Sequence, residues 1–363
     1  MAGSAFVPHH VHLVGSIGLP GPDDVFRIAG RRLGQRLKRL PDGEPGGRRL
    51  WISWQYPLLR SYAFLQPDPS GALRPTNKFP LLCLADGMSA KDVSFGELGY
   101  AREARASYED FVAARKRGDV AKGTRFQVCL PTPLAVIHSF CSKDIEVIEP
   151  AYEAAMIREV KTICRFIPQR DLCLQWDVCN EMVIWDGQET PGIPVHVKSG
   201  DELVARVARL AAAVPKDVEF GIHLCYGDFG ARHFVEPLDA SKMVSFANAI
   251  AAAVKRKLTY IHLPVPARHR DEAFYRPLAG LKLKRGTELY LGLVHATDGA
   301  EGTRARIGLA HRFVDDFGIA TECGMARART PETVDHLLRI HAACATAPTP
   351  RRKTSRRTKG GRS

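Results

Sequence analysis

The sequence predicts an α/β protein built on a parallel β-sheet, and more specifically a single-domain (β/α)8, or TIM, barrel over residues 1–346. Eight short apolar runs, typical of buried strands, alternate with longer segments of helical periodicity. Eight such units in roughly 340 residues fit a barrel better than an open doubly wound sheet. Neither GxGxxG nor GxxxxGK[ST] is present, so the sequence lacks the usual signals of a nucleotide-binding fold.

The expected strands are runs of four to eight mainly apolar residues, a length that suits a sheet covered on both faces. They are Val11–Val14, Pro80–Leu84, Arg125–Leu130, Leu172–Val178, Val218–Cys225, Thr259–Pro264, Glu288–His295 and Ile319–Cys323.

Longer segments between these runs have the pattern of helices. They include Pro22–Leu33, Glu97–Arg117, Ile148–Phe166, Asp201–Ala213, Ser241–Lys255, Thr303–Phe317 and Pro331–Cys344. The last has the clearest start, because Thr330 can cap it, Pro331 occupies the first turn and Glu332 follows.

Basic charge is concentrated at the C-terminus. The chain has a net charge of +13, and residues 347–363 carry seven arginines and lysines and no acid. Without them the charge is +6, an ordinary value, so nucleic acid is not an expected partner of the barrel. The segment is interrupted by proline, threonine and glycine and cannot bury a core, so we expect a disordered tail. It would serve as a solubilising appendage or as a non-specific contact for polyanions.

The nine cysteines are scattered without a CxxC motif, which is typical of reduced thiols in a cytoplasmic protein. No apolar run of about 18 residues predicts a membrane span. The first eight residues lack a basic region followed by an apolar stretch, so no signal peptide is expected.

His223 and Cys225 are the most informative residues of the chain. They lie two apart in a predicted strand, so their side chains point to the same face. Cys323 stands at the end of a later predicted strand. One histidine and two cysteines match the three protein ligands of a catalytic zinc site, which keeps a fourth position open. Ordinary packing of the strand side chains is the structural alternative.

Several other polar residues fall on predicted strands near the ends where barrels of this kind place their catalytic groups. Asp177 ends the fourth strand, His262 lies on the sixth and His295 ends the seventh. Recurring polar residues at one rim are not expected from core packing alone.

Two thiolate ligands make a soft metal site that suits a thiol substrate in the open position. Zinc would hold that thiol as a thiolate, the nucleophilic form, near neutral pH. The pattern therefore indicates transfer of an alkyl group to sulfur, with hydrolysis by a zinc-activated water as the competing use.

Two loops carry weaker signals. Gly15 would let backbone amides approach an anion, and Ser16 adds a hydroxyl donor. The loop Leu40–Arg48 is dense in glycine and proline and has three charged groups, Glu44 among them. Taken alone, each is also an ordinary turn.

The order of these segments resembles the cobalamin-independent methionine synthases, specifically their catalytic C-terminal half, from about residue 10 to 340. His-Leu-Cys-Tyr at 223–226 is similar to the family's zinc motif His-Met-Cys-Tyr. Cys-Gly at 323–324 is similar to the distal Asp-Cys-Gly. The resemblance implies zinc on His223, Cys225 and Cys323.

The resemblance also implies a thiol amino acid as substrate. Val14–Ser16 is similar to the family's Ile-Gly-Ser, which holds the homocysteine carboxylate. Asp42–Pro45 resembles His-Gly-Glu-Pro, whose glutamate contacts the substrate amino group, and Gln175–Asp177 resembles the strand that supplies a second amino contact. The implied substrate-binding residues are Gly15, Ser16, Glu44 and Asp177.

Two departures from the family concern candidate site residues. The family's remaining protein zinc ligand is a glutamate on the sixth strand, where His262 stands here, so His262 is the candidate fourth ligand. The family's acid histidine follows the seventh strand, and His295 is its positional neighbour and the candidate catalytic residue. No counterpart of the family's N-terminal half is present, which leaves folate and a corrinoid protein as alternative methyl donors.

We therefore expect zinc-dependent transfer of a methyl or alkyl group to a homocysteine-like thiol, a reaction that forms a thioether such as methionine. A thioether-cleaving lyase, or an alkyltransferase acting on a different thiol, would use the same site. A non-catalytic barrel that contacts polyanions through its basic tail would not use it.

Overall fold

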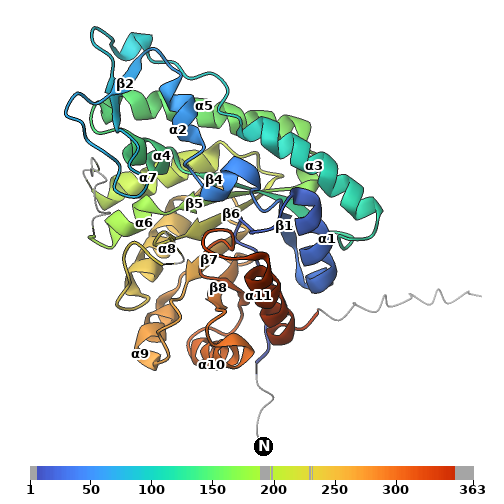
Figure 1. Ribbon diagram of the computed structural model, residues 1–363. Coiled ribbons are helices and arrows are strands. Elements are labelled where there is room, and N and C mark those ends of the chain that lie inside the picture. The colour runs from blue at the N-terminus through green and yellow to red at the C-terminus, as the bar shows by residue number, and fades with distance from the viewer. Residues whose placement is uncertain (1–5, 189–196, 198, 229, 231, 348–363) are drawn as a thin grey trace, which may run out of the picture.

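A computed structural model describes residues 6–188, 197, 199–228, 230 and 232–347. Its centre is a curled, seven-stranded parallel sheet with the order β1-β4-β5-β6-β7-β8-β9, and helices cover its outer side (Figure 1). The strands are β1 (Arg39–Pro41), β4 (Arg125–Pro131), β5 (Leu172–Val178), β6 (Glu219–Leu224), β7 (Tyr260–Pro264), β8 (Glu288–Val294) and β9 (Gly318–Thr321).

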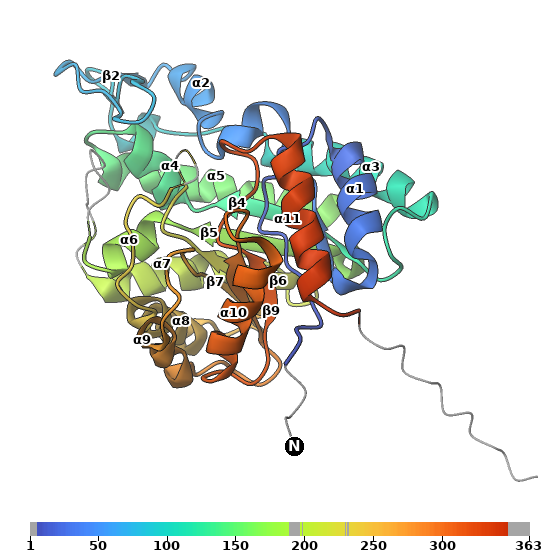
Figure 2. The same ribbon diagram turned by 60° about the horizontal axis from the view of Figure 1, so that its bottom comes forward.

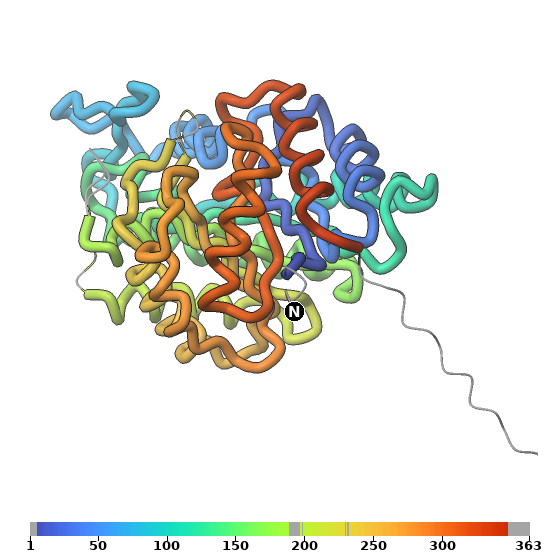
Figure 3. Tube along the Cα trace, turned by 90° about the horizontal axis from the view of Figure 1, so that it is seen from below, coloured from blue at the N-terminus to red at the C-terminus, as the bar shows by residue number. Residues whose placement is uncertain are grey.

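The N-terminal segment connects the two edges of this sheet. Val11 forms parallel bridges with Leu37, just before β1, and with Ile319 of β9. The backbone amide of His12 donates to the carbonyl of Ile319 at 2.9 Å. The first helix, α1 (Pro22–Leu33), and the last, α11 (Pro331–Cys344), consequently pack against each other (Figure 1 and Figure 3).

The parallel α/β class is confirmed, but one of the eight predicted strands does not form and another forms outside the main sheet. Val11–Val14 forms only isolated bridges. Pro80–Leu84 contributes β3 (Leu82–Leu84), which pairs antiparallel with β2 (Leu65–Pro67) outside the main sheet. Conversely, β1 lies in a segment that was expected to be a loop. The sequence does not reveal this strand because three residues ending in proline are too few to show a strand's alternation. The main sheet therefore has seven strands rather than the predicted eight.

The other six predicted strands are confirmed to within two residues at each end. The remaining α-helices are α2 (Gln55–Arg60), α3 (Tyr100–Lys116), α4 (Pro133–Phe140), α5 (Ile145–Phe166), α6 (Asn180–Trp185), α7 (Gly200–Ala212), α8 (Ser241–Ala253), α9 (Glu272–Tyr275) and α10 (Gly299–His311). Thr330 caps α11 as predicted, since its hydroxyl accepts from the amide of Thr333 at 3.3 Å.

No helix among the described residues is long and apolar enough to cross a membrane. The segment predicted to be a disordered basic tail lies outside the described residues from residue 348 onward.

Alternation along the strands separates an apolar outer face from a polar inner face. In β6, Phe220, Ile222 and Leu224 belong to the large apolar cluster that joins the sheet and the helices. Glu219 and His223 fall on the opposite face, because successive residues of a strand point to opposite sides. The same strand therefore contributes polar groups near both of its ends.

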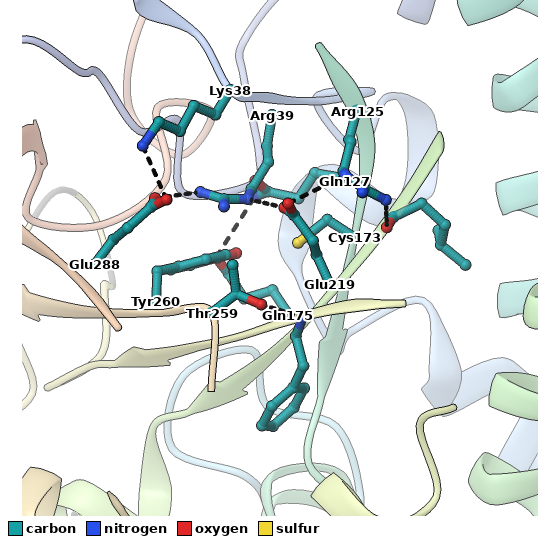
Figure 4. A network of polar contacts seen from close by, with 12 residues as sticks. Lys38, Arg39, Arg125, Gln127, Cys173, Gln175, Glu219, Thr259, Tyr260 and Glu288 are labelled. Carbon is teal, nitrogen blue, oxygen red and sulfur yellow. Dashed lines mark hydrogen bonds and ion pairs between the residues drawn. The ribbon is translucent and has the colours of Figure 1, made fainter. Parts of the chain in front are cut away.

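Arg39 organises the amino end of this inner face (Figure 4). Its side chain is 2% exposed, and it donates to Glu219 at 2.6 Å and to Glu288 at 2.9 Å. The guanidinium also lies 4.7 Å from the centre of the Tyr260 ring. Each of the three charged residues begins a strand, so this network lies at the end of the sheet away from His223.

The network favours the ionised form of Glu288. Burial opposes ionisation, but the charge of Arg39 and hydrogen bonds from Arg39 and Lys38 together lower the pKa of Glu288 to about 2. A carboxyl whose pKa is lower in the folded state than its ordinary 4.5 stabilises the fold above that pH. This contribution is lost as the pH falls from 4.5 toward 2.

We expect Arg39→Met to reduce the free energy of unfolding by roughly 3 kcal/mol, because it removes the buried cation that pairs with both Glu219 and Glu288. The variant should also lose less of its stability than the wild type as the pH falls from 4.5 to 2. Urea denaturation at several pH values measures both effects. Arg105→Met is the control: Arg105 pairs with Glu109 at the surface, and its loss should cost less than about 0.5 kcal/mol. Equal denaturation midpoints for the two variants would contradict this role of Arg39.

Candidate metal and substrate site

The structure brings together the three residues with the side chains of a metal site. One ligand atom from each of His223, Cys225 and Cys323 lies within 4.8 Å of the others, and all three residues are buried. The two sulfur atoms are 3.6 Å apart. His223 is near the carboxyl end of β6, Cys225 directly follows that strand, and Cys323 lies two residues beyond β9. The predicted grouping across strand ends is therefore present in the fold.

The hydrogen bonds of His223 suit a metal ligand. Its Nδ1 lies 2.7 Å from Nδ1 of His262, which is its register partner on β7. Its Nε2 is buried and has no hydrogen-bond partner among the described residues. Burial also lowers the pKa of His223, so the ring is in its neutral, metal-binding form. Metal-binding histidines commonly use one ring nitrogen for the metal and the other for an orienting hydrogen bond.

His262 was predicted as a fourth ligand, but it lies outside the group of three whose ligand atoms converge. It is fully buried and contacts the ring of His223, with 4.8 Å between the ring centroids. Its hydrogen bond to Nδ1 of His223 orients that ring and leaves Nε2 of His223 available. It thus supports the cluster without adding a converging ligand atom.

A third thiol accompanies the two predicted ones. Cys179, one residue beyond β5, packs with Cys225 and Cys323, and Trp51 and Phe234 cover the group. The pKa of the Cys225 thiol is raised, and its interaction with the neighbouring Cys179 thiol contributes more to this shift than burial does. The pKa values of Cys225 and Cys323 are both raised, so in the protein alone these two residues are thiols, and a bound dication would favour their ionised forms.

A partly buried cation lies beside the same sulfur atoms. Arg327 donates from Nη2 to the sulfur of Cys323 at 3.5 Å and is 3.6 Å from Asp228. The backbone amide of Gly227 donates to the sulfur of Cys225 at 3.2 Å. Both donors favour the thiolate forms of the two cysteines.

The predicted substrate-binding residues line the same cavity, which has a volume of about 170 Å³. Ser16 forms a bridge with Gly43, and the amide of Ile17 donates to the carbonyl of Gly43 at 2.8 Å. This pairing places the loop that contains Gly15 and Ser16 next to Glu44. Glu44 itself has φ +53°, an unusual value for a residue with a side chain, and such backbone strain is often found at binding sites.

Two glycines allow these loops to approach. A Cβ on Gly15 would lie 3.1 Å from Oε1 of Glu44, and a Cβ on Gly324 would lie 2.1 Å from Oγ of Ser16. Gly324 directly follows Cys323, so the absence of a side chain there permits contact between the metal-type cluster and the Ser16 loop.

Glu44 and Asp177 form a pair of buried carboxyls in the cavity. Burial is the main reason that both pKa values are raised, and Asp177 and Asp42 raise the pKa of Glu44 further. The charge of Arg327 opposes the shift at both residues, and Gln175 donates to Asp177 at 2.7 Å. A ligand cation between the two carboxyls would favour their ionised forms.

His295, the predicted catalytic residue, does not line this cavity. Its Nε2 lies 2.8 Å from the carbonyl of Val265, and its Nδ1 is 3.9 Å from Glu322. Burial lowers the pKa of His295 to about 3. The ring is therefore neutral and already hydrogen-bonded outside the cavity.

Sequence reasoning missed Arg327 and Asp228 in the cavity wall. Arg327 lies in the loop after β9 and Asp228 in the loop after β6, where no periodic pattern marks a residue as buried. The closeness of Arg327 to Cys323, four residues earlier, was the only available signal.

The fold and the site together define a parallel α/β protein with a buried His/Cys₂ cluster of metal-binding type beside two carboxyls. No protein-family model matches the chain, and no curated protein matches its sequence. Solved structures do share the fold. The B12-independent methionine synthase from Shewanella sp. W3-18-1, in complex with selenomethionine, is 15% identical, with 93% of this chain and 96% of that chain covered at a TM-score of 0.57.

The putative vitamin-B12 independent methionine synthase from Listeria monocytogenes is 13% identical, with coverage of 94% and 97% and a TM-score of 0.51. At such low identity these similarities establish a common fold. They confirm, at the level of the fold, the resemblance to cobalamin-independent methionine synthases that the motifs indicated.

We expect the purified protein to bind about one equivalent of zinc, and Cys225→Ser to bind less than roughly half an equivalent, because it removes one of three ligands. Metal analysis after dialysis against a weak chelator measures this. The control is Cys164→Ser on α5, a buried thiol that does not line the cavity and should leave the zinc content unchanged. Equal zinc content in all three proteins would contradict the proposed ligand set.

Proposed function

We propose that this protein transfers a methyl or alkyl group to the sulfur of a thiol amino acid, in a zinc-dependent reaction that forms a thioether such as methionine. The observation that carries the proposal is the shared cavity: the His223, Cys225 and Cys323 cluster faces the same space as the Glu44 and Asp177 carboxyls. A cation-binding pair beside a sulfur-rich metal-type cluster suits a substrate that has both an amino group and a thiol.

Zinc fits the donor set, because two sulfur atoms and one neutral imidazole with a free, buried nitrogen converge. When bound there, zinc would keep a substrate thiol in its thiolate form near neutral pH. We assign His262 to the orientation of His223 through their hydrogen bond.

The protein's own residues would hold the amino acid at three points. Glu44 and Asp177 would accept hydrogen bonds from the ammonium group, and Ser16 with the adjacent Gly15 amide would donate to the carboxylate. Fixing both ends directs the thiol toward the cluster. The sulfur then takes the alkyl group: a carbon–sulfur bond forms, and the carbon–donor bond breaks with its electron pair remaining on the donor.

The cavity wall favours this chemistry over hydrolysis. Trp51, Phe79 and Phe234 line it, and Trp51 and Phe234 also cover the thiol cluster. An apolar wall limits the water that could compete for the alkyl group. His295 is assigned no part in the transfer, since it does not line the cavity.

We further propose that the curled sheet belongs to a single barrel domain of the (β/α)8 type. The segment around Val11 would take the place of the eighth strand. Its parallel bridges to both edges of the sheet support this arrangement. A thioether lyase or a different thiol substrate would use the same residues, and substrate selection distinguishes these alternatives.

We expect zinc-loaded protein to release about one more proton when it binds homocysteine than when it binds homoserine, which has a hydroxyl in place of the thiol. Calorimetric titration in two buffers of different ionisation enthalpy counts the protons. A larger release with another thiol, and none with homocysteine, would exclude methionine formation.

Asp177→Asn should weaken binding of either amino acid by about tenfold, since a charged contact to the ammonium group is worth roughly 1.5 kcal/mol or more. Because burial raises the pKa of both carboxyls, the wild-type affinity should increase as the pH rises through neutrality. The same calorimetry measures both effects. An affinity that is unchanged in the variant would remove Asp177 from the amino-group site.

A further inference from the structure

Arg74 differs from the other buried arginines. Three arginines are less than 9% exposed among the described residues: Arg39, Arg74 and Arg306. Arg39 pairs with Glu219 and Glu288, and Arg306 pairs with Asp298 at 2.7 Å. The Arg74 guanidinium forms no ion pair and no hydrogen bond within the described part of the chain, and its Nε is a buried donor without a partner.

Arg74 is held in place by its backbone. It lies in the connection between β2 and β3, which stands above the main sheet at the top of Figure 1 and Figure 2. Its amide donates to the carbonyl of Phe79 at 2.8 Å, and its carbonyl accepts from the amide of Lys78 at 3.0 Å. The turn is therefore closed on itself, and the side chain points from it into the protein, 7% exposed.

The one contact of the guanidinium does not account for its burial. It lies 4.7 Å from the centre of the Phe140 ring. A cation–π contact of this kind is weaker than the desolvation cost of a buried ion. Burial lowers the pKa of Arg74 to about 10. No acid among the described residues opposes that shift or supplies this cation with a counter-charge.

Arg74 lines the same cavity as His223, Cys225 and Cys323. Next to it in the wall are Thr76, whose Oγ1 is buried without a partner, and Asn77. Unpartnered polar groups in one wall of a cavity, a guanidinium among them, are typical of a site that binds an anion. The guanidinium fork matches a carboxylate or a phosphate.

We propose that Arg74 and Thr76 form a subsite for a carboxylate or phosphate group of a second substrate, the alkyl donor, whose apolar body packs against Leu50, Trp51 and Phe79. This assignment rests on the proposed function, which gives the ammonium and carboxylate of the thiol acceptor to Glu44, Asp177 and Ser16. The acceptor's charges are then already matched, and the Arg74 charge is left for the other substrate.

The unpaired charge of Arg74 should destabilise the ligand-free protein. If the charge of Arg74 is matched only by a ligand, Arg74→Met removes an unpaired buried charge from the ligand-free protein. The midpoint of thermal unfolding should then rise. Arg39→Met is the matched control: it breaks paired charges, and the midpoint should fall. A structural role for Arg74 would instead make both midpoints fall.

Binding tests the ligand class directly. The probes are phenyl phosphate, benzoate and, as the uncharged control, benzyl alcohol, each followed by calorimetry and by the shift in unfolding midpoint. We expect one or both anions to bind the wild-type protein. Their affinity should fall at least tenfold in Arg74→Met and recover partly in Arg74→Lys. Benzyl alcohol should bind Arg74→Met as well as it binds the wild type. Preference between the two anions identifies the anionic group.

Cys225→Ser separates this inference from the proposed function. Anion binding should persist in that variant, because Arg74 does not depend on the zinc ligands. Absence of thiol-dependent proton release in the wild type, together with Arg74-dependent anion binding, would refute the function and leave the subsite standing. Equal anion affinity in wild type and Arg74→Met, or binding of neither anion to the wild type, would overturn the subsite.

Discussion

The strict alternation of side chains along parallel strands is the constraint on which the rest of this structure depends. Helices cover the outer face of the sheet, so every second residue of β6 must be apolar. The intervening positions point to the inside of the curl, where polar groups can find one another. Glu219 at one end of β6 and His223 at the other occupy the same face for this reason.

The inner face is polar along its whole length, and it remains stable only because nearly every group there has a partner. Arg39 and its two carboxylates close the amino end. In the middle, Gln175 bonds His12 at 3.0 Å and Tyr260 at 2.8 Å. At the carboxyl end the pairing stops: the free nitrogen of His223 and the guanidinium of Arg74 are without partners among the described residues. Unpaired buried groups are costly, and these two line one cavity, where a bound ligand would give each of them a partner.

Much of the site could be predicted because its residues lie on regular strands. His223 and Cys225 share a strand face by spacing alone, and Cys323 follows another apolar run. His262 was correctly placed beside them, yet its contact with His223 depends on the register between β6 and β7, which the sequence does not specify. Prediction failed where the chain is irregular: β1 is three residues long, and the connection that holds Arg74 has no periodic pattern.

The sequence by itself determined the parallel α/β class, the positions of six of the seven strands in the main sheet and the pairing of a histidine with two cysteines at strand ends. These features follow from local patterns of apolar residues, which act over a few positions. Only the tertiary structure decided that Pro80–Leu84 leaves the main sheet, that His295 turns away from the cavity and that Arg327 and Arg74 turn toward it. Such outcomes depend on which distant segments compete for the same buried space, and that competition is settled only when the whole chain packs.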